Sequence, residues 1–396
     1  MSLSWPLTVP ENLVFSVSTG VAHYLVGSIF FDLVHWLAHR SHRSRFRLFR
    51  LLGQAHTAHH RYFDRNLKFN NKFIYDNLVS HMPLEFFCQA IGSALSWLCC
   101  AVLYGQSVQV LTIVLVVEIT RTLIVAWNLG HDSNHLAYTK LPKDTYSVIV
   151  GPQYHALHHV DPQNYFGSMV RLVDWVLGTA STLRGRRVTM TGSSGALGQA
   201  LCKQLDGEVS SIKRLRYGRH WSYDDYSGIE SILAATDILV LAHGSKANDA
   251  FQANCESAAN LIELFKRART QSKPELKPEV WYVGSEAELH GSWVDSMKNY
   301  TDSKRAFAKF ARGFYDDEDI IYRHIVPAAF KSDMGPAIVS ADWAAKVALW
   351  WIRRGAMYVP VTYTGFAFVN YLRFMYWVKP KKWVLQFEDD SGSESG

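Results

Sequence analysis

The 396-residue sequence has only five cysteines, and they show neither a CxxC pair nor a disulfide framework. This is typical of a protein in a reducing compartment. Net charge is also small, at +6. No dense run of Lys and Arg alternates with aromatic residues, so composition gives no reason to expect nucleic-acid binding. No internal repeat recurs at a fixed period. The length is typical of two or three domains.

Charged residues are missing from two long stretches near the N-terminus. Asn12–Phe31 contains no Asp, Glu, Lys or Arg and is long enough to cross a membrane. Phe86–Val117 is uncharged and broken near residues 105–107, which predicts a hairpin of helices over about 84–104 and 107–127. The first stretch lacks a basic start and a small-residue cleavage site, so it is not predicted to be a cleavable signal peptide. A buried helix pair in a large soluble protein remains the alternative.

Basic residues concentrate directly after the first apolar stretch. They are Arg40, Arg43, Arg45, Arg47, Arg50, Arg61, Arg65, Lys68 and Lys72. A solvated basic face is one explanation. Beside a membrane segment, however, such a cluster favours a cytoplasmic location. The sequence therefore predicts a multi-pass membrane protein whose active sites face the cytoplasm.

Histidine is abundant where charge is scarce. Ten of the 17 histidines lie in short clusters with two recurring spacings, HxxxH and HxxHH. They are His35, His39, His56, His59, His60, His131, His135, His155, His158 and His159. Histidines three or four apart on a helix share one face, so each cluster can direct its imidazoles to one point. Neutral imidazole suits iron, zinc and copper, and ten exceed what one tetrahedral ion can use. The pattern predicts a site for two metal ions.

After Thr182 the pattern changes to strands alternating with helices, which is typical of an α/β domain with a parallel sheet. A strand at Arg187–Thr191 leads into TGSSGALG and a helix over 196–205. Glycines in such a loop permit a tight turn and the close approach of a pyrophosphate to a helix N-terminus. Further strands are expected at Val209–Ile212, Asp237–Ala242, Val280–Val283 and Ile320–Val326. The predicted fold is a Rossmann-like, doubly wound sheet.

The residues after the second expected strand bear on the choice of dinucleotide. Lys213, Arg214 and Arg216 stand where an acidic residue would bind a ribose 2′-hydroxyl, and Glu208 comes too early. Because a cation can pair with a 2′-phosphate, NADP(H) is favoured over NAD(H).

Tyr300 and Lys304 form a second candidate constellation with Ser285. On a helix, Tyr300 and Lys304 share a face, so the ammonium can lower the pKa of the phenol and help bind the nicotinamide ribose. The tyrosine could then pass a proton to or from a substrate oxygen during hydride transfer.

Each half resembles a known family. Residues 15–182, with DLVHWLAHRSHR, HTAHH, NLGHDSNH and HALHHVDPQNYFGSMVRLVDWVLGT, resemble the fatty acid hydroxylase/sterol desaturase superfamily. Residues 185–380 resemble short-chain dehydrogenases/reductases. The whole chain is similar to fused sterol desaturase/short-chain dehydrogenase proteins of the cyanobacterial type. We expect domains at 1–182 (all-α, membrane-embedded) and 185–380 (α/β), with a disordered acidic tail at 388–396.

The second resemblance implies a set of site residues. Asn254, Ser285, Tyr300 and Lys304 match the catalytic set. The cofactor-binding residues implied are Thr191, Gly192, Ser193, Ser194, Gly195, Leu197, Gly198, Lys213, Arg214, Ala242 and Gly244. The sequence departs from the family in three places: Ser292 is an alternative to Ser285, LAHG at 241–244 replaces the usual N-A-G, and Pro327–Ala328 replaces P-G.

The resemblances imply a bifunctional, lipid-modifying oxidoreductase. Two iron ions and O2 would hydroxylate or desaturate a membrane lipid, and NADP(H) would serve alcohol–carbonyl interconversion. Because no haem, flavin or cysteine cluster is evident, electrons are expected from a separate ferredoxin or cytochrome. Two alternatives remain: an aldehyde-to-alkane enzyme of the wax-synthesis kind, or one half acting only as an anchor or nucleotide-binding regulator. The sequence leaves the oligomeric state open.

The aromatic segment Val361–Val378, followed by Lys379, Lys381 and Lys382, has two interpretations. It is either a closing strand and helix of the dehydrogenase core or an interfacial segment resting on the membrane.

Overall fold

The computed structural model describes residues 13–144, 146–270 and 273–385, and the tail expected to be disordered lies outside them. The chain divides into two compact units, Met1–Ala180 and Ser181–Gly396. Each unit is described separately.

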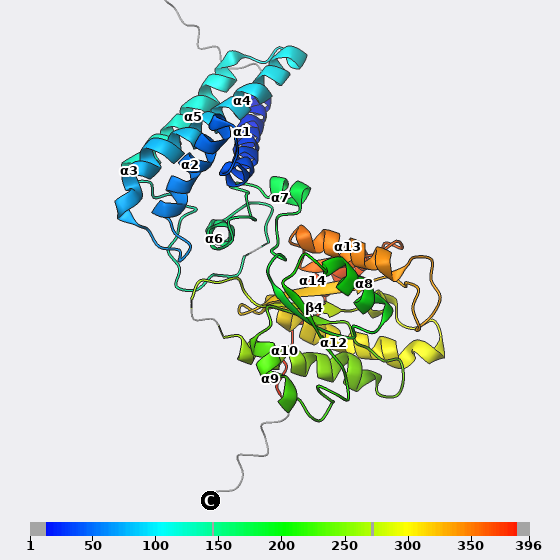
Figure 1. Ribbon diagram of the computed structural model, residues 1–396. Coiled ribbons are helices and arrows are strands. Elements are labelled where there is room, and N and C mark those ends of the chain that lie inside the picture. The colour runs from blue at the N-terminus through cyan, green and yellow to red at the C-terminus, as the bar shows by residue number, and fades with distance from the viewer. Residues whose placement is uncertain (1–12, 145, 271–272, 386–396) are drawn as a thin grey trace, which may run out of the picture. The chain divides into compact units, whose positions relative to one another are not determined.

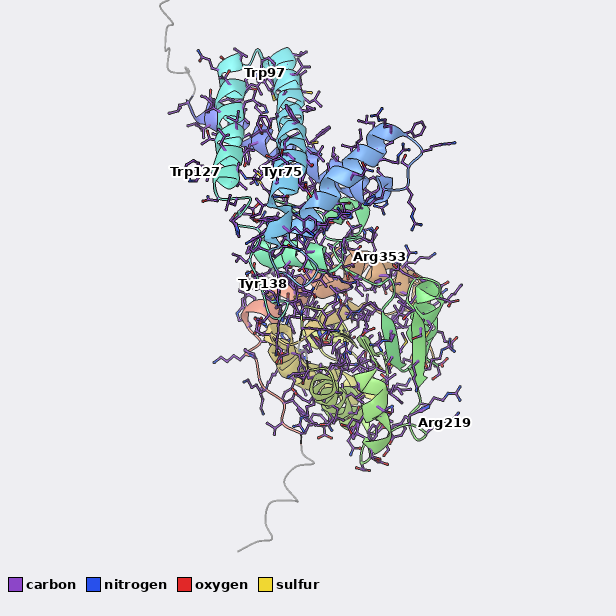
Figure 2. The ribbon with its side chains drawn as sticks, turned by 60° about the vertical axis from the view of Figure 1, so that its left-hand side comes forward. Tyr75, Trp97, Trp127, Tyr138, Arg219 and Arg353 are labelled. Carbon is purple, nitrogen blue, oxygen red and sulfur yellow. The ribbon has the colours of Figure 1, made fainter. Side chains whose placement is uncertain are left out.

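Three long helices form the body of the first unit: α1 (Leu13–Ser41), α4 (Met82–Tyr104) and α5 (Val108–Trp127) (Figure 1). Among the described residues, three helical segments are apolar and long enough to cross a membrane. The predicted α4–α5 hairpin is confirmed, with Gly105 in the left-handed region (φ +67°) and Ser107 Oγ accepting from the backbone N–H of Gln109. Trp97 and Trp127 lie towards opposite ends of this hairpin (Figure 2).

Close packing of α1 on α4 requires glycine. A Cβ on Gly92 would lie 2.6 Å from Phe30 Cβ and 2.9 Å from Gly27 Cα, so the two backbones can approach only without it. Such small-residue contacts are the usual way for apolar helices to pack in lipid.

Shorter elements gather at one end of this bundle. They are α2 (Arg47–Tyr62), the 3-10 turn η1 (Asn71–Phe73), α3 (Ile74–Asp76), the π-helical turn η2 (Asn77–His81), α6 (Pro152–Val160) and α7 (Leu172–Leu177). The η2 turn runs directly into α4, so its extra residue per turn changes the direction of the side chains that follow.

The second unit contains a six-stranded, all-parallel sheet in the order β2-β1-β3-β4-β5-β6, counted over its described residues. The strands are β1 (Arg187–Thr191), β2 (Ser211–Leu215), β3 (Ile238–Leu241), β4 (Glu279–Val283), β5 (Ile321–Pro327) and β6 (Tyr358–Val361). The helices are α8 (Ala196–Leu205), α9 (Glu230–Ala234), α10 (Ser257–Ala268), α11 (Ala287–His290), α12 (Lys298–Asp316), α13 (Ala341–Arg353) and α14 (Phe366–Tyr376). The predicted doubly wound fold is confirmed.

Successive side chains along a strand point to opposite faces of the sheet, so the sheet has a hydrophobic core on each face. In β3, Leu239 and Leu241 face the core formed with α10 and α12, whereas Ile238 and Val240 face the core formed with α8 and α13. All four side chains are buried, as a central parallel strand requires.

Two details differ from the sequence-based expectations. β2 lies later than expected, so Lys213 and Arg214 fall within the strand and Arg216 follows it. β6, which was not assigned, precedes α14, and Phe374 of α14 is buried in the core. The aromatic segment supplies Val361, the last residue of β6, and helix α14, whose outer side leaves Phe368, Val369 and Leu372 exposed. The segment thus closes the core, and its contact with a membrane stays a prediction.

Candidate functional site

Nine histidines of the first unit converge in two groups near the base of the helix bundle. The first group contains His35, His39, His56, His60 and His158, and the second contains His59, His135, His155 and His159. Within each group the candidate ligand atoms lie within 4.8 Å of one another. Helix spacing explains the convergence, because α1, α2 and α6 each place histidines one turn apart on one face.

The outer nitrogens of four of these rings face oxygen acceptors. The contacts are His35 Nδ1 to Phe166 O (3.2 Å), His158 Nδ1 to Asn164 O (2.9 Å), His59 Nδ1 to Asn77 Oδ1 (3.3 Å) and His135 Nδ1 to Asp132 Oδ1 (2.6 Å). Because only oxygen acceptors stand there, each Nδ1 carries the proton and each Nε2 keeps a lone pair. Such outer contacts orient metal-ligating histidines.

The inner nitrogens meet one another. Nε2–Nε2 distances are 3.0 Å for His35–His158, 3.1 Å for His59–His135 and 2.9 Å for His135–His155. Two unprotonated nitrogens cannot share a hydrogen bond, so the lone pairs of the His35–His158 and His59–His135 pairs converge without partners. A cation at each point would satisfy them, and the donor set fits two transition-metal ions.

Burial keeps the imidazoles of α2 and α6 neutral. It lowers the pKa of His56, His59, His60, His155 and His159 well below 6.5, and that of His158 to about 4. Neutral rings can bind a metal near pH 7 without first losing a proton.

His131, the tenth candidate, lies outside both groups. It is exposed, and its ring lies tilted against that of Phe69, with ring centroids 4.1 Å apart. The expectation of a shared helical face was wrong here: α5 ends at Trp127, and left-handed residues Leu129 and Gly130 follow. His131 and His135 therefore do not share a helix face.

Some residues around the centre were not singled out from the sequence. His81 is buried, and its ring stacks on that of His59 with centroids 4.2 Å apart. Asp132 lies three residues before His135, a short spacing that could have indicated it. His81 and Asn77 lie on the π-helical turn and gave no such signal.

The polar residues after the last histidine cluster hold its loop in place. Asp174 accepts hydrogen bonds from the backbone N–H groups of Phe166 (2.9 Å) and Gly167 (2.8 Å) and from Tyr154 Oη (2.8 Å). Phe166 in turn offers its carbonyl to His35. Asp174 thus positions one of the oxygens that orient the histidines.

A cavity of about 250 Å³ adjoins both histidine groups. His35 and His56 of the first group and His59 of the second contribute to its wall. Its apolar lining includes Phe31 and Val125. A substrate carbon in this cavity would lie beside the metal positions.

In the second unit, the backbone of the glycine loop lies so close to neighbouring backbone atoms that side chains would not fit at Gly192 and Gly198. Gly192 has φ +65°, and a Cβ there would lie 2.3 Å from the carbonyl carbon of Ala242. A Cβ on Gly198 would lie 2.2 Å from Gly192 O. The loop lies at the carboxyl ends of β1 and β3, where the strand order reverses, which is the usual dinucleotide position in such sheets. The cradle fits a dinucleotide.

The basic residues near this loop are exposed. Arg214 lines a surface pocket with Ser193 and Ser194. Lys213 does not line that pocket. Arg216 directly follows β2.

The predicted catalytic side chains come together. Ser285 is hydrogen-bonded to Tyr300, whereas the alternative, Ser292, is exposed and bonded to Val294 O. Lys304 Nζ donates to Tyr282 Oη (3.1 Å) and Val283 O (2.8 Å). The expected lowering of the Tyr300 pKa by Lys304 was wrong: burial raises the pKa of Tyr300 to about 12, and Lys304 donates its hydrogen bonds elsewhere. Burial also lowers the pKa of Lys304 to about 8.

A hydroxyl relay joins Lys304 to Asn254. Tyr282 Oη accepts from Lys304 and donates to the backbone carbonyl of Asn254 (2.8 Å). The Asn254 side chain donates to Ser303 Oγ (2.9 Å) and accepts from Ser245 N–H (3.1 Å). Asn254 is thus fixed within the site.

His243, in the LAHG departure, is held in the interior. Its ring contacts Thr191 Oγ1 (2.6 Å) and Ser257 Oγ (3.0 Å). Burial lowers its pKa to about 3, so the ring is neutral. A neutral imidazole therefore bridges β1 and α10.

A second missed feature is a buried carboxylate next to Ser285. Glu288 Oε1 accepts from the Ser285 backbone N–H (3.1 Å), and Oε2 accepts from His324 Nε2 (3.0 Å). His324 Nδ1 contacts Tyr322 Oη (3.0 Å). A Cβ on Gly284 would lie 2.3 Å from Glu288 Oε1, so the carboxylate requires glycine at that position.

Comparison with protein families settles the nature of the first unit. Residues 24–179 match the family described as fatty acid hydroxylase, and all nine converging histidines lie within that range. The N-terminal half therefore contains a match to the fatty acid hydroxylase family. Together with the three apolar helical segments, the fatty acid hydroxylase domain supports membrane association.

One curated relative covers more of the chain. A Synechocystis protein named monoglucosyldiacylglycerol epimerase is 28% identical over 251 residues, or 56% of this chain. The match spans 60% of that relative's length.

Solved structures resemble the part of the chain outside the fatty acid hydroxylase domain. A Burkholderia cenocepacia short-chain dehydrogenase in complex with NADP is 15% identical, with a TM-score of 0.39 over 48% of this chain and 93% of its own. A Sphingobium yanoikuyae short-chain dehydrogenase in complex with NADPH is 14% identical, with a TM-score of 0.38 over 47% and 92%.

Proposed function

We propose that this protein is a bifunctional, lipid-modifying oxidoreductase. Its first unit would hydroxylate or desaturate a membrane lipid with O2, and its second would interconvert an alcohol and a carbonyl with NADP(H). The observation that carries the proposal is the convergence of nine imidazoles in a fatty acid hydroxylase domain.

Two iron ions held by the histidine groups would supply the O2 activation that oxidises an unactivated C–H bond. The protein's own residues prepare the site. Asp132, Asn77 and the carbonyls of Asn164 and Phe166 hold the ring orientations. The apolar wall at Phe31 and Val125 would admit a hydrocarbon and limit water.

In the second unit, Tyr300 would exchange a proton with the substrate oxygen while hydride moves to or from the nicotinamide. Ser285 would share a hydrogen bond with the same oxygen, since it already contacts Tyr300. Lys304, with its relay through Tyr282 to Asn254, would return the proton to Tyr300 or remove it.

A second candidate for this unit is epimerisation of a lipid-borne hydroxyl. The Synechocystis relative is named as an epimerase, and the Ser285–Tyr300–Lys304 site suits the chemistry. An alcohol would lose hydride to NADP+ and a proton to Tyr300. The resulting ketone would then regain both, with hydride delivered to the opposite face, so no net oxidation would occur.

The first reaction needs single electrons, whereas NADPH delivers a hydride. We therefore propose a separate one-electron donor of the ferredoxin or cytochrome type. The basic residues after Trp36 favour a cytoplasmic position for the histidine end of the bundle. The three apolar helical segments support a multi-pass topology.

Lipid profiling of cells with and without the protein, under air and under nitrogen, tests both activities. We expect an oxygenated or desaturated lipid that forms only in air and is lost when His59 and His60 are both changed to alanine. Tyr300→Phe should alter only its alcohol or ketone partner. An air-independent profile would overturn the hydroxylase assignment. A stereoisomer that depends on Tyr300 but not on air would instead support the epimerase.

A further inference from the structure

An ion pair crosses between two of the apolar helices. Arg121 on α5 donates to Glu85 Oε1 on α4 (3.0 Å) and to Gln89 Oε1 (3.3 Å), and Gln89 Nε2 donates to Glu85 (3.3 Å). Charged side chains within membrane helices are costly and usually mark a functional site. These three residues require an explanation beyond packing.

All three side chains line the cavity beside the histidine groups. His81 bridges the short distance between the ion pair and the centre: its Nε2 lies 3.8 Å from Glu85 Oε2, and its ring stacks on His59. The exposed fraction of the side chain is 21% for Glu85 and 35% for Arg121. Both side chains line the cavity, so they are not packed into a closed interior.

The charges and hydrogen-bonding groups of Glu85, Gln89 and Arg121 determine which functional group of a lipid can bind beside them. Glu85 and Arg121 neutralise each other, so the cluster has no net charge to offer an anionic headgroup. Glu85 can only accept hydrogen bonds, Arg121 can only donate them, and Gln89 can do both. A hydroxyl matches this set because it donates and accepts at one oxygen, whereas a carbonyl cannot donate to Glu85. A bare hydrocarbon would strip water from these groups without replacing it.

We propose that Glu85, Gln89 and Arg121 form a subsite for a neutral hydroxyl group on the lipid substrate, next to the carbon that is oxidised. The substrate class is then a hydroxylated lipid, and neither a free fatty acid nor an alkane. The inference rests on the proposed function, since it takes the adjoining histidine groups to be the reaction centre.

The full-length protein, purified in detergent and loaded with Co²⁺, provides the test. Titration with decan-1-ol, decane and decanoate is followed through the visible spectrum of the bound Co²⁺. We expect decan-1-ol to bind about tenfold more tightly than decane or decanoate, as one well-placed hydrogen-bonding group allows. The preference should vanish in Gln89→Leu and in the charge-neutral double variant Glu85→Leu/Arg121→Leu. Cys99→Ala, an exposed position on α4, is the matched control.

The outcomes separate the two proposals. Bound Co²⁺ with equal affinity for decan-1-ol and decane, or with tighter binding of decanoate, overturns the subsite and leaves the metal centre intact. A chain that holds no Co²⁺ overturns the proposed centre, and the subsite with it. The comparison of ligands on the unaltered protein needs no variant to fold, and the Co²⁺ content of each variant reports whether its centre is intact.

Discussion

The two units build their sites in opposite ways. The fatty acid hydroxylase domain repeats one side chain nine times and leaves inner nitrogens facing one another without a proton to share. The second unit uses different side chains, and the contacts of Lys304, Asn254 and Glu288 are satisfied within the protein. The first site is therefore incomplete without cations, whereas the second is preorganised by the fold alone.

The largest expected effect is on the metal-dependent site. His158 Nε2 contacts the inner nitrogens of His35, His39 and His60, so His158→Ala should empty the first group. We expect O2-dependent product to fall to background and metal content to drop, while NADPH binding is unchanged. Metal analysis and product assay check this. His131→Ala is the matched control, and equal metal loss in that variant would contradict the two-group arrangement.

The next effect concerns the preorganised site. Tyr300→Phe removes the proton donor, and alcohol–carbonyl turnover should fall by roughly 10²–10⁴-fold. NADPH affinity and metal content should stay at wild-type levels, which separates this variant from His158→Ala. Turnover near the wild-type rate would show that the unit binds nucleotide without this chemistry.

A buried ion pair should make the second unit sensitive to acid. Burial alone would raise the pKa of Glu279, but the charges of Arg323 and Arg186 outweigh it and hold the pKa below the usual 4.5. The unfolded chain therefore binds this proton more readily, and the free energy of unfolding should fall as pH drops below about 4.5. Glu279→Gln should cost about 3–5 kcal/mol near neutral pH, because Arg323 stays buried and charged.

Denaturant unfolding at several pH values, followed through loss of NADPH binding, measures both effects. The variant should also lose part of the acid dependence. Glu230→Gln, an exposed position, is the control. An unchanged pH profile in Glu279→Gln would place the acid sensitivity elsewhere.

Asp132→Asn tests the outer contacts of the histidine centre. The carboxylate holds His135 Nδ1 at 2.6 Å, and replacing such a partner typically lowers metal affinity by about 10–100-fold. Metal titration should detect the change, while exposed Asp76→Asn should leave affinity unaltered. Wild-type affinity in Asp132→Asn would mean that ring orientation is set by packing.

The smallest effect is expected for Glu288→Gln in the second unit. Glu288 positions Ser285 through one backbone hydrogen bond, so kcat should fall by about tenfold, comparable to the loss of one such bond, with KM for NADPH unchanged. We expect kcat–pH profiles of Glu288→Gln with and without His324→Gln to show the same loss of kcat, because the two residues are hydrogen-bonded to each other. Independent, additive losses would indicate that the two residues act separately.

Much of both sites could be predicted from sequence. Nine histidines were identified because polar residues recurring at helical spacing in an apolar background serve no packing purpose. The glycine loop was identified because strand, glycines and helix follow directly along the chain. His131 was misplaced because spacing alone does not reveal that α5 stops at Trp127. Lys213 and Arg214 were placed after β2 because the end of an exposed edge strand leaves little pattern.

The sequence by itself determined the two-part architecture, the apolar helices and the residue types of both centres, since these depend on local spacing and composition. Tertiary structure decided which histidine belongs to which group, because the division into sets of five and four depends on how α1, α2 and α6 meet. It also decided the contacts of His81, Glu288 and the Glu85–Arg121 pair. Each of these acts through partners distant in sequence or brought near only by a π-turn or a helix crossing, and residue spacing does not record such contacts.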